Sequence, residues 1–97
     1  MRLVFDTKAI ADFENIRQWI SLEHPRAAEV GLEHIRAASL KLVAFPGMGR
    51  EGEEAGTREF VVRGLSYLII YKVNTQLDEL VIVAVHHTSR SRRPISE

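Results

Sequence analysis

Residues 67–73 read Tyr-Leu-Ile-Ile-Tyr-Lys-Val, and residues 80–87 read Leu-Val-Ile-Val-Ala-Val-His-His. Both runs are apolar at consecutive positions, which is typical of central strands that other elements cover. The residues between them, 74–78, have the composition of a turn. A third strand is predicted over residues 59–63, with Gly64 in the turn that follows it. Together these segments predict a β-meander at the C-terminal end of the fold.

Upstream of the strands, apolar residues recur every three or four positions, which predicts two helices. We expect the first helix over residues 8–22 and the second over residues 25–45, with Pro25 at its first position. The short connection between them predicts an antiparallel hairpin. Asp12 and its charged neighbours are expected on the polar face of the first helix. The expected buried stripes are Ile10, Phe13, Ile16, Trp19 and Ile20, then Ala28, Leu32, Ile35, Ala38, Leu42 and Phe45.

A short first strand is predicted over Leu3, Val4 and Phe5, which leaves its place in the sheet open. The resulting order of strand, two helices and three strands predicts an α+β fold, with a helical hairpin packed on a small, mostly antiparallel sheet. Residues 46–56 hold four of the six glycines and predict a mobile loop rather than a packed segment. The whole chain, residues 1–97, is expected to form one domain that ends in an irregular basic tail over residues 89–97.

The composition is that of an ordinary globular domain, with 97 residues of which 45% are hydrophobic and 27% are charged. The absence of cysteine excludes disulfides, thiolate metal sites and a cysteine nucleophile. Thirteen basic and thirteen acidic residues give zero net charge, which argues against a grip on nucleic acid by overall charge. No apolar run approaches the roughly 20 residues of a membrane span, and no signal-type region precedes the first strand. We therefore expect a cytoplasmic protein with no membrane partner.

The sequence contains no phosphate-binding loop motif and no metal-binding motif, so we expect no cofactor and no metal. His86 and His87 end the last predicted strand, where adjacent side chains point to opposite faces. Structural roles are favoured for both, and the alternative is a general acid or base beside Arg90. Arg90, Arg92 and Arg93 form a cluster in the tail that is either solvated or a docking patch for an acidic partner or a phosphate backbone.

Five segments, in this order and spacing, resemble the ParE/RelE superfamily of bacterial toxins over residues 3–94. The helix end and loop are the most recognisable part, with Phe45-Pro46-Gly47-Met48-Gly49-Arg50 at their junction. Each segment alone is a weak signal, and the ordered set is a strong one. The segments are residues 25–29, 42–50, 56–59, 67–73 and 81–90.

The resemblance implies the toxin of a type II toxin–antitoxin system, neutralised by a cognate antitoxin that wraps across the helical hairpin and sheet. Two activities occur in the superfamily. RelE-type members cleave mRNA on the ribosome, and ParE-type members inhibit DNA gyrase. A third possibility is a degenerate member that binds its antitoxin and has lost toxicity.

The sequence fits the ParE branch better than the ribonuclease branch. The ribonuclease branch has an arginine on the middle strand, and here residues 68–71 read Leu-Ile-Ile-Tyr. Thr88 stands near that branch's second arginine position, and Pro94 and Ile95 stand near its C-terminal aromatic acid or base. The Gly-Thr-Arg-Glu step of the ParE branch, residues 56–59, is present, as is a histidine followed closely by arginine.

The resemblance therefore predicts a gyrase inhibitor without catalytic residues and without sequence-specific DNA binding by the toxin alone. For the ribonuclease alternative, His86 or His87 would carry the proton, assisted by the cations Arg58, Arg63 and Arg90. Antitoxin contact is expected on apolar grooves beside the helices, with Trp19, Ile20 and Leu32 as candidates wherever they are exposed. The expected contacts to the target are Arg58, His87, Arg90, Arg92 and Arg93.

Overall fold

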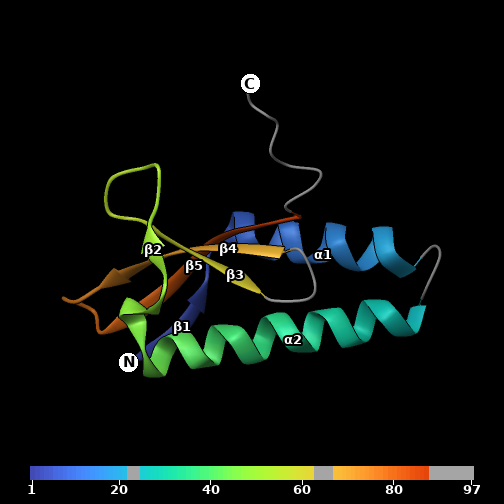
Figure 1. Ribbon diagram of the computed structural model, residues 1–97, viewed down its shortest axis with the longest axis horizontal. Coiled ribbons are helices and arrows are strands. Elements are labelled where there is room, and N and C mark those ends of the chain that lie inside the picture. The colour runs from blue at the N-terminus through green and yellow to red at the C-terminus, as the bar shows by residue number, and fades with distance from the viewer. Residues whose placement is uncertain (22–24, 63–66, 88–97) are drawn as a thin grey trace.

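The computed structural model describes residues 1–21, 25–62 and 67–87, with side chains described outside residues 19–28. The expected order of strand, helix, helix and three strands is confirmed, and two short elements are added between the second helix and the meander (Figure 1). The elements are β1 (Arg2–Phe5), α1 (Thr7–Ser21), α2 (Pro25–Ala44), the 3₁₀ helix η1 (Pro46–Met48), β2 (Arg50–Glu51), β3 (Arg58–Val62), β4 (Tyr67–Asn74) and β5 (Glu79–His87).

The five strands form one sheet in the order β1-β5-β4-β3-β2. The first strand pairs with β5 in parallel, and every other pair is antiparallel. The long apolar strand β4 therefore lies in the middle of the sheet, as its sequence predicts. The two helices run antiparallel to each other beside the sheet (Figure 1).

One face of the sheet packs against the helices and forms the core. On β4 the core face carries Tyr67, Ile69 and Tyr71, which pack with Ile35 and Leu42 of α2. A register shift between Ile70 and Tyr71 leaves one residue of β5 unpaired. Because of this shift, the side chains of β5 no longer alternate strictly between the two faces of the sheet. Ile82 and Val85 are three residues apart and belong to the same buried cluster.

Three expectations about the helix faces are wrong. Ile10 is 57% exposed rather than buried, and Asp12 faces β5 rather than solvent. Both differences arise because Ala9, fully buried, is the residue of that turn that points into the core. Phe45 is 61% exposed because α2 ends at Ala44 and the backbone leaves the helix ahead of Pro46.

The expectation of an unpacked loop over residues 46–56 is also wrong for the first half of that segment. Its first half folds into η1 and β2, and Gly49 is buried against the core. A Cβ atom on Gly49 would lie 2.6 Å from the Tyr71 hydroxyl and 2.8 Å from the Glu59 carbonyl. Glycine is needed here for close packing rather than for flexibility.

Candidate functional site

An apolar groove of about 740 Å³ lies between the two helices and the end of β1. Its floor is formed by Phe5, Phe13 and Leu32, and the exposed Ile10 stands at its side. The rings of Phe5 and Phe13 lie 5.3 Å apart, which fixes the floor. Charged side chains also line it, namely Glu14, Arg17, Glu29, Glu33 and Arg36. An apolar groove bounded by charges has the form of a site for a partner segment.

The structure locates only one of the residues that we predict to contact the antitoxin. Leu32 is half-buried and lines the groove. The side chains of Trp19 and Ile20 lie outside the described residues. Sequence patterning missed Ile10 and Phe5 as members of the groove, because both belong to apolar runs that predict burial.

The face of the sheet opposite the helices carries an apolar row that ends at His86. On that face His86 lies across from Leu68, and Leu68 lies across from Val61. The next row holds Ile70 and Ala84, with Glu59 at its side. The strand positions nearest His86 on this described face are therefore apolar, and charged groups (Glu59 on the face, Lys8 and Asp12 on α1) stand around them.

The cations on this face of the described sheet lie away from His86. Lys72 pairs with Val81, five residues along β5 from His86, or roughly 16 Å at the usual rise of a strand. Arg2 forms an ion pair with Glu79, and Arg50 forms one with Glu59 at 3.3 Å. Both arginines are therefore partly neutralised by carboxylates of the same face.

The two histidines are separated by the sheet. His87 lies on the core face, where its ring packs edge-on against Tyr67 at 5.2 Å. His86 lies on the opposite face. Arg58 shares the core face with His87 but pairs with Tyr71, four residues along β4 from Tyr67. The structure therefore does not bring His86, His87 and Arg58 together. Arg63, Arg90, Arg92 and Arg93 lie outside the described residues.

Arg58 is tied to the segment that follows η1. Its guanidinium donates a hydrogen bond to the Gly49 carbonyl. The hydroxyl of the fully buried Tyr71 donates to the Pro46 carbonyl at 2.6 Å and accepts from the Gly49 N–H at 3.0 Å. These three bonds hold residues 46–49 against the core. Spacing in the sequence gives no signal for them, since Tyr71 is 22 residues from Gly49.

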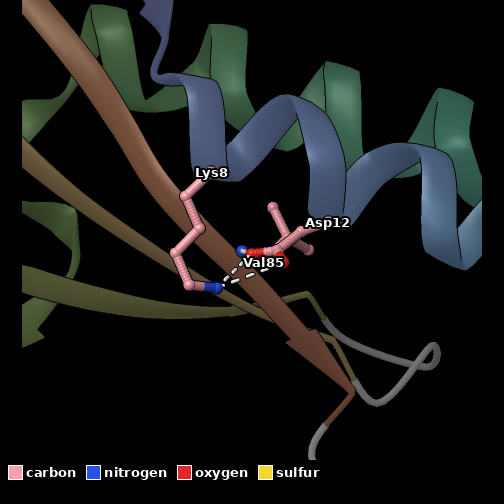
Figure 2. Close-up of polar contacts among 3 residues, drawn as sticks. All are labelled: Lys8, Asp12 and Val85. Atoms are coloured by element: carbon pink, nitrogen blue, oxygen red, sulfur yellow. Dashed lines mark hydrogen bonds and ion pairs between the residues drawn. The ribbon is translucent and has the colours of Figure 1, made fainter.

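The Asp12 side chain accepts a hydrogen bond from a backbone N–H at the edge of β5 that β1 does not cover (Figure 2). The pairing with β1 ends at Ile82, and the next N–H that needs a partner on that edge belongs to Val85. The Asp12 carboxylate accepts this N–H at 3.0 Å and also binds the Lys8 ammonium at 3.0 Å. Asp12 thus replaces the hydrogen bond that a longer first strand would provide.

Replacing Asp12 with alanine should destabilise the protein by about 2 kcal/mol, because the Val85 N–H would lose its partner in a partly buried position. Asp12→Asn keeps an acceptor oxygen and should lose less than half as much. Urea denaturation of the three proteins measures the difference. Equal stability of Asp12→Ala and the wild type would show that water replaces the carboxylate.

The environment of His86 favours its neutral form. Burial lowers its pKa below the usual value of about 6.5, and the Lys8 ammonium lowers it further. The carboxylates of Asp12 and Glu59 oppose this shift without cancelling it. At neutral pH His86 is therefore an uncharged imidazole.

The lowered pKa of His86 predicts a loss of stability in mild acid. The unfolded chain binds a proton near pH 6.5 and the folded chain only at lower pH, so stability falls as the pH drops from about 7 through that window. The His86→Gln variant should lose less stability over pH 7 to 5 than the wild type. Urea midpoints across this range measure it, and parallel profiles of the two proteins would contradict the assignment.

Two classes of site are not found in the part of the chain that the structure describes. No group of three or more histidine, aspartate or glutamate side chains is placed to hold a metal ion there. Neither of the described helices is long and apolar enough to cross a membrane.

Comparison with known proteins gives one consistent family. Residues 3–92 match the family model described as ParE toxin of the type II toxin–antitoxin system parDE. The chain is 27% identical over 85 residues to a protein of Sinorhizobium fredii named "Putative toxin Y4kP", covering 88% of both chains.

Solved structures share the fold. One is from the chromosomal ParDE toxin–antitoxin system of P. aeruginosa, with a TM-score of 0.79 and 24% identity, covering 90% of this chain and 95% of the other. Another is the isolated RelE toxin of E. coli, with a TM-score of 0.68 and 14% identity, covering 94% of this chain and 87% of the other. With a family model that spans nearly its whole length, the chain belongs to the ParE toxin family of type II toxin–antitoxin systems.

Proposed function

We propose that this toxin acts by binding a protein target, DNA gyrase, and performs no phosphoryl-transfer chemistry of its own. The observation that carries the proposal is the apolar row Val61, Leu68 and His86 on the face of the sheet opposite the helices, where Leu68 is buried and Val61 is 45% exposed. Cleaving RNA through attack by the 2′-hydroxyl needs a base, an acid and cations that stabilise the charge on phosphorus. Here the described face offers one neutral imidazole, and the cation whose charge acts on it, the Lys8 ammonium, is paired with the Asp12 carboxylate.

The charges of the same face also favour a protein target. Glu59 and Glu79 place two carboxylates on it, each with a side chain only 12% exposed. A surface that holds RNA for cleavage concentrates positive charge. Here the ion pairs with Arg50 and Arg2 leave little excess charge, in line with the zero net charge of the chain.

Ribosome-bound mRNA tests the catalytic alternative. The purified toxin should leave a translated mRNA intact, as read by primer extension, at concentrations that stop growth when it is expressed. Cleavage that His86→Ala or His87→Ala abolishes would overturn the proposal in favour of a ribonuclease. Cleavage that survives both substitutions would point to a contaminating nuclease, and repurification would remove it.

We also propose that the cognate antitoxin covers the groove between the helices. The groove exposes Ile10 beside an aromatic floor, and an amphipathic helix with apolar anchors three and four residues apart fits such a surface. The ParDE and RelBE structures that share this fold come from toxin–antitoxin systems, which supports an antitoxin as the occupant.

A further inference from the structure

Two large apolar side chains are exposed in the turn that directly follows α2. Phe45 is 61% exposed and Met48 is 38% exposed. The Met48 N–H donates to the Phe45 carbonyl at 3.0 Å, which closes one turn of backbone and brings the two residues close together. The Lys41 carbonyl, one helical turn before Phe45, accepts the Phe45 N–H at 2.9 Å. Lys41 and Phe45 are therefore neighbours at the end of the helix.

Positive charge flanks this apolar pair. Lys41 precedes Phe45 by one helical turn, and Arg58 donates to the carbonyl of Gly49, the residue after Met48. In the part of the chain that the structure describes, neither cation forms an ion pair with a carboxylate. The four side chains Lys41, Phe45, Met48 and Arg58 are named here the α2-end surface.

One acidic residue of the neighbouring hairpin, Glu51, lies opposite Arg58 in the β2–β3 pairing, and no ion pair joins the two described side chains. Glu53 and Glu54 lie at the tip between β2 and β3, and Figure 1 shows that tip pointing away from the end of α2. The α2-end surface therefore combines exposed apolar area with positive charge, chiefly that of the exposed Lys41, although the chain as a whole is neutral.

The surface is held in place from the core. The buried Tyr71 hydroxyl binds both Pro46 and Gly49, on either side of Met48, and Gly49 is itself buried. A loop that is fixed before binding loses little conformational entropy when a partner docks on it. Large apolar side chains exposed on a fixed loop are therefore well placed for recognition.

We propose that the α2-end surface docks an acidic segment of the toxin's protein target, which seats an apolar side chain on Phe45 and Met48 and places carboxylates near Lys41 and Arg58. The charge complementarity identifies the occupant as acidic. Nucleic acid fits less well, because a phosphate backbone would leave the Phe45–Met48 pair without an apolar partner. This inference rests on the proposed function in that the target is a protein.

Removing the apolar pair tests the docking surface. The double variant Phe45→Ser with Met48→Ser should weaken growth inhibition in E. coli by about 30-fold, measured as the inducer level that halts growth, since hot-spot side chains carry most of the energy of an interface. Val30→Ser is the matched control, because Val30 is 53% exposed on α2 away from this surface. A melting temperature for each purified variant within a few degrees of the wild type confirms that it is folded.

Charge substitution tests the acidic character of the partner. Lys41→Glu should reduce growth inhibition, and Lys41→Arg should preserve it. Binding of a 30-base-pair DNA duplex and of a single-stranded RNA 30-mer, each followed by fluorescence anisotropy, should be absent or equal in all variants. Binding that is present in the wild type and lost in the double variant would assign the surface to nucleic acid and overturn the proposal.

Two assays, of growth inhibition and of gyrase inhibition, show whether the docking surface or the proposed gyrase target is wrong. A double variant as toxic as the wild type overturns the docking surface, whatever happens to gyrase. If the wild type leaves gyrase unaffected and the double variant still loses toxicity, gyrase is the wrong target and the docking surface stands.

Discussion

The Gly49→Ala variant should lose about 3 kcal/mol of stability, the largest effect that we expect from a single methyl group in this protein. The new Cβ would lie 2.6 Å from the Tyr71 hydroxyl and 2.8 Å from the Glu59 carbonyl, far inside van der Waals contact. Neither neighbour moves freely, because Tyr71 is fully buried and the carbonyl belongs to β3. Overpacking of this kind costs about 1–3 kcal/mol, and breaking the Tyr71 hydrogen bonds adds to it.

Gly47→Ala provides the matched control, since a Cβ at Gly47 meets nothing within 4 Å. Thermal unfolding should show a melting temperature lower by roughly 15 °C for Gly49→Ala and nearly unchanged for Gly47→Ala. If the two variants have the same melting temperature, the backbone around Gly49 shifts easily to make room for the methyl group. The hydrogen bonds of Tyr71 then do not hold this segment in place. The rigid α2-end surface would then lose its physical basis.

A second large effect is expected in the groove between the helices. Ile10→Glu should weaken binding of the cognate antitoxin by about 100-fold, because it places a carboxylate next to the acidic residues Glu14 and Glu29 and removes an apolar anchor. The protein should remain folded, since Ile10 is 57% exposed. Val30→Glu introduces the same charge at a helix position that is 53% exposed and does not line the groove.

Isothermal titration of the two variants with the purified antitoxin measures this difference. Expression provides a second reading, because the Ile10→Glu toxin should escape neutralisation and remain toxic when the antitoxin is co-expressed. Full neutralisation of Ile10→Glu, with wild-type affinity, would place the antitoxin elsewhere on the molecule.

Periodicity in the sequence predicted the long elements well, because burial and chain geometry act there in the same direction. The apolar stripe on α2 predicts that Ile35 and Leu42 are buried, and both are fully buried. The apolar run of β4 predicts a central strand, and β4 is the middle strand of the sheet. The parallel pairing of β1 with β5 was left open, since it brings together residues 77 positions apart that share no local pattern.

The missed features depend on tertiary contacts of polar groups and glycine. Asp12 has the spacing of a solvent-facing residue, and only the early end of β1 requires a carboxylate at the β5 edge. Gly49 belongs to a glycine-rich segment that reads as flexible until Tyr71 is placed beside it. Separation of His86 from His87 was predicted correctly, because alternation along a strand is a local property.

Gyrase inhibition by direct binding, which we propose for this toxin, can be tested with purified components. The most direct measurement is the supercoiling of relaxed plasmid by purified gyrase and ATP, with the purified toxin titrated in and the products separated by gel electrophoresis. We predict that supercoiling falls as wild-type toxin rises, and that the His86→Ala variant inhibits equally well because no proton transfer is involved. Supercoiling that continues unchanged at a large molar excess of folded wild-type toxin would contradict the account.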